Sequence, residues 1–218
     1  MGKIIAIEGV DGAGKFTISK ALKTLADAHG KVANIISFPR YSETIAGRAL
    51  GDFLSGRTYV PDDARSIATL YAMDRFESKA LIASSLSNSD LLIFDRYIAS
   101  NVAYQASKVE PGRATEMIQW ISNLELNVYE LPAPNLNVYL RISSEASARN
   151  VLKKPRRAYT ELEADRHEAD NSLLSRVSIM YEKLAAESIL GNWFTVDVDF
   201  GSSLRSPEEI AVEIWSNI

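Results

Sequence analysis

A glycine-rich stretch near the beginning of the chain constrains the fold more than any other feature. Residues 9–17 read GVDGAGKFT; they follow a short apolar run at residues 4–7 and precede apolar residues at helical spacing. A strand, a glycine-rich turn and a helix in this order predict a phosphate-binding loop, because the N–H groups of the turn converge on one anion and the helix N-terminus adds positive charge. The residues expected to hold a nucleotide triphosphate are Gly9, Gly12, Ala13, Gly14, Lys15, Phe16 and Thr17.

One position departs from the G-x-x-x-x-G-K-[ST] pattern of such loops. Phe16 stands where a hydroxyl group normally ligates magnesium, and Thr17 comes one residue late. Neighbouring positions on a helix point about 100° apart, so we do not expect Thr17 to replace that ligand directly. Magnesium would then depend on phosphate oxygens, on water and on the carboxylates of Asp11 and Asp95.

Strand-like and helix-like segments alternate along the rest of the chain. The apolar runs that read as strands lie at residues 4–7, 32–37, 90–97, 137–142 and 193–198. This alternation predicts an α/β fold of the P-loop NTPase class, with a five-stranded parallel sheet between helices in a three-layer α/β/α arrangement. At 218 residues, 46% of them hydrophobic, the chain is expected to form a single domain over residues 1–218.

The helical segments also carry recognisable boundaries. They are expected at residues 17–26, 43–54, 61–86, 98–107, 112–129, 144–152 and 163–190, and from Ser206 onward. Gly30 suits a helix C-terminus, whereas Ser206 followed by Pro207 suits a helix start. Ligands of such folds bind at the carboxyl ends of the strands. We therefore expect the segments after the strands, which begin at Gly9, Phe38, Asp95 and Ser143, to share one rim.

The composition excludes several classes of protein. A net charge of −4 disfavours a general nucleic-acid-binding role, and the lack of cysteine excludes disulfides and thiolate metal sites. The first strand is expected to begin almost at Met1, so we expect no signal peptide, and no apolar run approaches the length of a membrane span. We therefore expect a cytoplasmic protein with small phosphate ligands and no nucleic-acid or membrane partner.

The residue types at the predicted rim indicate phosphoryl transfer. Lys15 would reach the outer phosphates, and Asp95 ends a buried strand in the Walker-B pattern, which places a carboxylate beside the phosphate loop. Arginines 40, 75 and 96 supply more guanidinium groups than one triphosphate needs, and they would suit a second phosphate. The dense basic cluster at residues 153–157 would form a lid over the donor, in a segment around residues 153–163.

Five short motifs, at residues 8–15, 38–41, 70–75, 95–104 and 165–168, resemble those of the thymidylate kinase family, in its bacterial type with a basic lid. The resemblance covers nearly the whole chain. It implies an enzyme that transfers the γ-phosphoryl group of ATP to dTMP, giving dTDP and ADP in dTTP synthesis, with Mg²⁺ and as a homodimer.

The resemblance also implies roles for individual residues. Phe38 and Tyr71 would pack on the two faces of thymine, Arg75 and Asn101 would contact the base, and Tyr104 would crowd the ribose 2′ position. The other substrate contacts would come from Arg40, Tyr41, Arg96, Ser100, Asp165 and His167, and Arg149 would stack on the donor adenine. The metal ligands would be Asp11, Asp95 and Glu168, and the catalytic residues Lys15, Arg96, Asp11, Lys153, Arg156 and Arg157.

Alternatives remain open at this stage. Phe38 and Tyr71 lie beside apolar patterns, so plain core packing would also explain them, and a charge run such as residues 153–157 is usually a solvated surface. At the level of function, a deoxynucleoside kinase would share the loop and the Asp95–Arg96 pair. A nucleotide-binding homologue with catalysis impaired by Phe16 is the other alternative. The three rim arginines favour an acceptor that already carries a phosphate.

Overall fold

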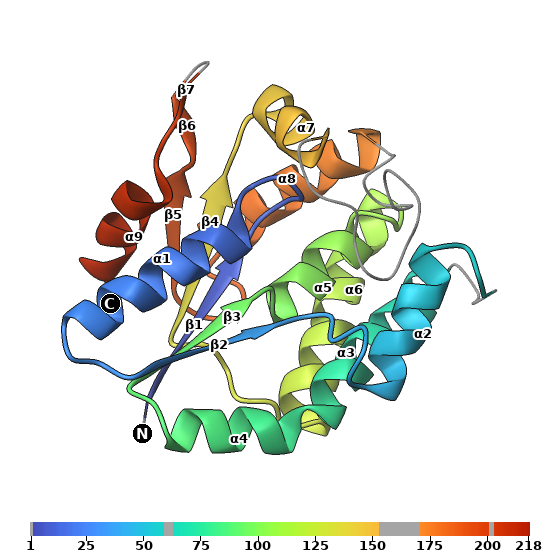
Figure 1. The fold of residues 1–218 in the computed structure, drawn as a ribbon. Helices are drawn as coiled ribbons and strands as arrows, with labels where there is room; N and C mark the ends of the chain where they lie inside the picture. Colours follow the sequence, from blue (N-terminus) through green and yellow to red (C-terminus); the bar gives the residue numbers. More distant parts are fainter. Residues whose placement is uncertain (1, 59–62, 153–170, 201–202) are drawn as a thin grey trace.

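Five parallel strands form one sheet at the centre of the molecule (Figure 1). The computed structural model describes residues 2–58, 63–152, 171–200 and 203–218. The strand order is β2 (Ala33–Ser37), β3 (Leu91–Asp95), β1 (Lys3–Glu8), β4 (Leu136–Arg141) and β5 (Trp193–Asp197). The register pairs Ile5 with Ile93 and Ile7 with Val138, and all four side chains are buried. The predicted sheet is confirmed, and its apolar strands follow from burial on both faces.

Helices cover both faces of the sheet, as predicted for a three-layer fold (Figure 1). On one face α1 (Lys15–Ala28) packs against β2, β3 and α9 (Pro207–Trp215); on the other, α8 (Asn171–Ala186) packs against β4, β5 and α5 (Ile98–Ala106). The remaining helices of the described chain are α2 (Ile45–Leu54), α3 (Ala64–Glu77), α4 (Lys79–Ser87), α6 (Ala114–Ser122) and α7 (Ser144–Leu152). None of the helices described is long and apolar enough to cross a membrane.

The single helix predicted over residues 61–86 is wrong, because α3 and α4 are separated at Ser78. The Ser78 hydroxyl donates back to the carbonyl of Asp74 at 2.8 Å and accepts from Arg40 Nη1 at 3.0 Å. Such local bonding competes with regular helix, and here a residue from the segment after β2 reinforces it. The predicted start is confirmed in part, since Asp63 caps α3 by accepting from the backbone N–H groups of Arg65 and Ser66.

The helix predicted over residues 112–129 changes its winding along its length. It begins as a 3₁₀ turn, η1 (Pro111–Arg113), continues as α6 and ends as a π-helical segment, η2 (Asn123–Val128). π-Helical segments are rare and occur frequently at functional sites. This one carries Glu125, whose side chain is fully buried.

The C-terminal part of the chain also differs from expectation. Helix α8 ends at Ala186, four residues before the predicted end, because Ser188 and Leu190 adopt left-handed backbone conformations; the predicted residues before 171 lie outside the described chain. A short hairpin, β6 (Asp199–Phe200) with β7 (Ser203–Leu204), was not predicted. The predicted start of α9 is confirmed: Ser206 and Glu209 form a reciprocal capping box.

The carboxyl ends of β1, β2 and β3 meet at one edge of the sheet, because all three strands are parallel neighbours. The phosphate loop, the segment after Ser37 and the β3–α5 connection therefore lie together, as expected. Ser143 follows β4 at the same edge and precedes α7. Its hydroxyl donates to Asp199 at 2.5 Å and accepts from the backbone N–H of Ala146 in α7 at 3.3 Å.

Candidate functional site

A cavity of about 500 Å³ opens along this edge. Its volume lies within the range of small-molecule sites, which is about 300–1,000 Å³. Its walls come from the phosphate loop, the segment after β2, helices α2 and α3, and the β3–α5 region. The lining residues are Asp11, Gly12, Gly14, Lys15, Phe16, Thr17, Ser37, Phe38, Pro39, Tyr41, Leu54, Tyr71, Arg75, Asp95, Arg96, Ser100, Asn101, Tyr104 and Gln105.

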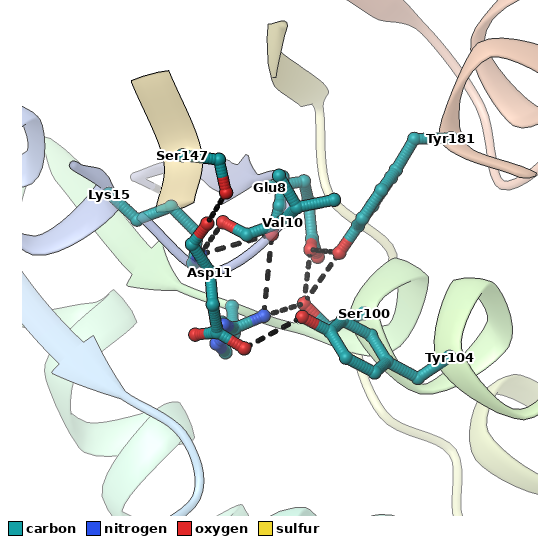
Figure 2. Close-up of polar contacts among 10 residues, drawn as sticks. Glu8, Val10, Asp11, Lys15, Ser100, Tyr104, Ser147 and Tyr181 are labelled. Atoms are coloured by element: carbon teal, nitrogen blue, oxygen red, sulfur yellow. Dashed lines mark hydrogen bonds and ion pairs between the residues drawn. The ribbon is translucent and has the colours of Figure 1, made fainter. Parts of the chain in front are cut away.

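The phosphate loop is held in shape by its own lysine and by helix α7 (Figure 2). Lys15 Nζ donates to the carbonyls of Gly9 at 3.0 Å and Val10 at 2.8 Å, which keeps the ammonium group over the loop. From α7, the Ser147 hydroxyl donates to the carbonyl of Asp11 at 2.6 Å. A second contact from α7 runs from Asn150 to the carbonyl of Gly12 at 2.9 Å.

Gly12 is required at its position for two reasons. Its φ of +82° lies in the left-handed region, and a Cβ atom there would lie 2.4 Å from the carbonyl oxygen of Ser147. The backbone of α7 therefore approaches the loop so closely that no side chain fits between them.

Asp11, Arg96 and Tyr104 form one connected group on the cavity wall, and Figure 2 labels Asp11 and Tyr104 of this group. Arg96 Nη2 contacts Asp11 Oδ1 at 2.6 Å, and the Tyr104 hydroxyl donates to Asp11 Oδ2 at 2.9 Å. Burial raises the pKa of Tyr104 well above its ordinary value, so its hydroxyl stays a donor. Arg96 has a φ of 66°, an uncommon value for a residue with a side chain, and such strain clusters at functional sites.

Close to this group lies Glu8, a buried carboxylate that the sequence analysis did not single out (Figure 2). It accepts from the Ser100 hydroxyl at 2.5 Å, the Tyr181 hydroxyl at 3.0 Å and the backbone N–H of Tyr97 at 2.9 Å. Burial raises its pKa, although these donors act in the opposite direction. Glu8 thus ties the end of β1 to α5 and, through Tyr181, to α8.

The opposite wall of the cavity combines aromatic rings with a buried ion pair. Phe38 lies against Phe94 and Tyr97 in the main core, with ring centroids 5.9 and 6.2 Å away, and Tyr71 is partly exposed at the cavity. Both the core and the ligand-facing interpretations of Phe38 are therefore compatible with its position.

Arg75 and Asn101 on the same wall share a partner that the sequence analysis missed. Arg75 donates to both carboxylate oxygens of Glu125, at 2.5 and 2.6 Å, and Asn101 Nδ2 donates to the same carboxylate at 2.8 Å. Glu125 follows Met117 and Ile121 on the apolar stripe of its helix, and an acid at such a position was the available signal.

Gln105 lines the cavity, and the sequence analysis missed it as well. It is fully buried, and neither end of its amide has a hydrogen-bond partner within the described structure. Its place one turn after Asn101 puts both residues on the same side of α5, so helical spacing from Asn101 could have identified it. A buried amide without partners costs free energy unless a ligand supplies them.

Four predicted ligand contacts of the described chain are absent from the lining of this cavity: Gly9, Ala13, Arg40 and Arg149. Arg40 donates from Nη1 to Ser78 and pairs with Glu43 at 3.6 Å, and Arg149 is exposed on α7. Buried Asp74 holds the backbone N–H of Arg40 at 2.9 Å. The predicted lid around residues 153–163 and its neighbours, namely Lys153, Arg156, Arg157, Asp165, His167 and Glu168, lie outside the described residues.

Comparisons with known proteins agree with this geometry. The family model described as Thymidylate kinase matches residues 7–202. A thymidylate kinase from Mycobacterium tuberculosis is 33% identical over 201 residues, which cover 90% of this chain and 92% of that protein. A thymidylate kinase from Homo sapiens is 32% identical over 148 residues, 68% of this chain and 65% of the relative. A solved structure of thymidylate kinase from Candida albicans superposes on this chain with a TM-score of 0.74 at 21% identity. The match covers 99% of this chain and 90% of that one, and it shows that the two share a fold.

Proposed function

This chain belongs to the thymidylate kinase family and is a phosphotransferase that makes dTDP and ADP from dTMP and ATP, and we propose how its own residues divide that work. The proposal rests chiefly on one observation: the phosphate loop and the Arg75–Asn101 wall line a single cavity. Such a cavity can hold a donor and an acceptor together. The chain acts as a single domain, with residues 153–163 as its lid.

The donor half of the site is the phosphate loop. Backbone N–H groups between Gly9 and Thr17, together with Lys15, bind the phosphates of ATP, and Arg149 contacts the adenine. During transfer, an oxygen of the dTMP phosphate forms a bond to the γ-phosphorus while the bond to the ADP oxygen breaks. The loop and the lid residues Lys153, Arg156 and Arg157 stabilise the charge on the transferred group.

The acceptor half holds the phosphate of dTMP beside the donor. Arg96 offers a guanidinium fork at the cavity wall, and Asp11 fixes its orientation through the 2.6 Å contact. Arg40, Tyr41, Ser100, Asp165 and His167 complete the acceptor contacts. Since the acceptor phosphate is already anionic, the chemistry needs no strong general base, and positioning supplies most of the acceleration.

The carboxylates of the site suit a Mg²⁺ ion that is held mainly by the phosphates of the nucleotide. Mg²⁺ commonly takes one or two protein carboxylates, with phosphate oxygens and water in its other positions. Asp95 lines the cavity and offers such a carboxylate, with Asp11 and Glu168 as the further proposed ligands. When bound, the ion would neutralise charge on the phosphates. Phe16 supplies no oxygen, so we propose that it changes how the metal is held without abolishing activity.

The base of dTMP fits between the aromatic residues of the opposite wall. Phe38 and Tyr71 supply apolar surface, Arg75 donates hydrogen bonds, and the amides of Asn101 and Gln105 find their missing partners on the ring. Tyr104 limits space at the ribose 2′ position. This arrangement favours the binding of a pyrimidine base whose edge combines carbonyl acceptors with an N–H donor, as the edge of thymine does.

Two wider proposals follow from the family. The protein acts as a homodimer in the cytoplasm, without nucleic-acid or membrane partners. Exposed apolar side chains such as Phe76 and Leu81 offer surface that a second subunit would cover. Light scattering coupled to size-exclusion chromatography tests the dimer, and a monomeric mass would refute it.

A coupled assay with ATP, Mg²⁺ and a panel of acceptors tests the proposed function. We expect dTMP to turn over faster than dCMP and AMP, with thymidine itself a poor acceptor. Equal rates for dTMP, dCMP and AMP would contradict the assignment. Turnover of thymidine but not dTMP would favour a deoxynucleoside kinase, an alternative that the family membership does not favour. Binding of both nucleotides without ADP formation would favour a nucleotide-binding homologue with impaired catalysis.

A further inference from the structure

A buried carboxylate outside the cavity holds two side chains that line it. Glu125 is absent from the cavity wall, yet its carboxylate accepts three hydrogen bonds from Arg75 and Asn101. All three residues are at most 2% exposed. A charge-assisted, bidentate arginine–carboxylate pair fixes the plane of the guanidinium group more strictly than a single bond would.

The contacts of Asn101 determine which end of its amide is available to a ligand. An amide nitrogen has two hydrogens, and Asn101 Nδ2 donates one to Glu125 at 2.8 Å and the other to the carbonyl of Ala68 at 3.0 Å. The reverse orientation would point Oδ1 at two acceptors. Asn101 Oδ1 is buried and has no partner among the described residues. Asn101 lines the cavity, so Oδ1 is the end of its amide that is left for a ligand.

Arg75 supplies hydrogen-bond donors beside the acceptor of Asn101. Glu125 engages its Nε and Nη2 atoms, so the guanidinium group is held as a fixed set of donors 5.9 Å from the Phe38 ring centroid. Burial is the largest single influence and lowers the pKa of Arg75, but the charge and hydrogen bonds of Glu125, together with the charge of Asp74, keep the pKa above its ordinary value. The wall thus presents a permanent donor beside a fixed acceptor.

We propose that Glu125 is a positioning residue that sets the base specificity of this site. By holding Arg75 as a donor and Asn101 as an acceptor, it makes the wall complementary to the imide edge of thymine or uracil. That edge carries carbonyl acceptors and one N–H donor. The amino edge of cytosine carries the reverse pattern and would place acceptor against acceptor and donor against donor. This inference rests on the proposed function, in which the base lies at this wall.

The variant Glu125→Gln breaks this set of hydrogen bonds with almost no change in volume. Glu125 Oε2 accepts from Arg75 Nε, and Oε1 accepts from both Arg75 Nη2 and Asn101 Nδ2. An amide at position 125 accepts at one end only, so its nitrogen faces a donor of Arg75 in either orientation. The guanidinium group and the Asn101 amide then lose the partner that fixes their direction. We expect the ratio of kcat/KM for dTMP to that for dCMP to fall at least about tenfold, since a buried site whose polar groups are misdirected no longer favours the cognate substrate.

The experiment compares wild type, Glu125→Gln and Glu125→Asp, with kcat and KM measured separately for dTMP and dCMP at saturating ATP and Mg²⁺. Glu125→Asp keeps the charge but withdraws the carboxylate by one methylene, so we expect a smaller loss of selectivity. Glu213→Gln is the matched control, because Glu213 also pairs with an arginine, Arg205 at 2.6 Å, but on α9 and away from the cavity. Its selectivity should equal that of wild type.

The outcomes separate this inference from the proposed function. If wild type prefers dTMP and a folded Glu125→Gln variant keeps the same dTMP to dCMP ratio, the role of Glu125 is overturned while the function stands. If Glu125→Gln does not fold, an unchanged ratio in Glu125→Asp overturns it instead. If wild type turns over neither nucleotide, the proposed function fails, and calorimetric binding of dTMP and dCMP to the same variants decides the role of Glu125.

Discussion

Replacing Gly12 with alanine tests whether close packing of α7 holds the phosphate loop in shape. The new Cβ atom would lie 2.4 Å from the carbonyl oxygen of Ser147 and 3.0 Å from its Cα atom. Both contacts are to backbone, so no side-chain rotation relieves them. Either the loop or the first turn of α7 has to move, and the hydrogen bonds between them are lost.

The expected cost follows from the two parts of this perturbation. A left-handed conformation costs a residue with a side chain about 1–2 kcal/mol. The bonds from Ser147 to Asp11 and from Asn150 to Gly12 are worth about 1 kcal/mol each. We therefore expect Gly12→Ala to lower the free energy of unfolding by about 3–4 kcal/mol. It should also weaken ATP binding, because the N–H groups of the loop no longer converge.

Gly30→Ala provides the matched control. Gly30 is also left-handed, with a φ of +70°, but a Cβ atom there would meet nothing within 4 Å. Its substitution carries only the conformational cost of about 1–2 kcal/mol and should leave ATP binding unchanged. Urea denaturation and calorimetric titration with ATP measure both effects. The reasoning is refuted if Gly12→Ala is no less stable than Gly30→Ala, or if both bind ATP as wild type does.

Three further predictions concern single side chains of the site. Phe16→Ser should lower the Mg²⁺ concentration for half-maximal activity roughly fivefold, equivalent to about 1 kcal/mol. A metal titration in which this concentration is unchanged or higher would count against the prediction. Tyr104→Phe should lower the free energy of unfolding by about 1.5–3 kcal/mol, because it removes a hydrogen bond to the Asp11 carboxylate; equal urea midpoints would contradict this. Burial raises the pKa of Glu8, so folding favours its protonated form, and this contribution to stability is lost as the pH rises through the raised pKa. Glu8→Gln cannot titrate and should gain stability relative to wild type as the pH rises above 4.5, the ordinary pKa of glutamate; parallel stability–pH curves would exclude it.

Much of the fold could be predicted because its signals are local. The apolar runs that form β1 and β3 are buried on both faces, and burial of this kind leaves a continuous hydrophobic stretch in the sequence. Gly9 and Gly12 of the phosphate loop are likewise needed where they stand, since their backbone geometry allows few other residues. The start of α9 was predicted because its capping box lies within four neighbouring residues.

The errors occurred where distant residues decide the local structure. The break at Ser78 involves Arg40, which is 38 residues earlier in the chain, and the π-helical segment η2 carries Glu125 to a partner 50 residues away. Gln105 gave no signal by residue type alone, because an amide in a helix is ordinarily exposed. Arg40 contacts Ser78 and Glu43 in this structure, and its role toward the acceptor phosphate stays a prediction.

The sequence by itself determined the sheet, the phosphate loop and the family, because each depends on patterns that neighbouring residues carry. Only the tertiary structure decided the polarity of the base wall. A buried hydrogen-bonding group is defined by its partner, and the partners of Arg75 and Asn101 come from a separate helical segment. The same holds for Asp11, whose oxygens are engaged by Arg96 and Tyr104 from the β3–α5 region. Residue types can be read along the chain, whereas the direction of a donor or acceptor exists only after folding.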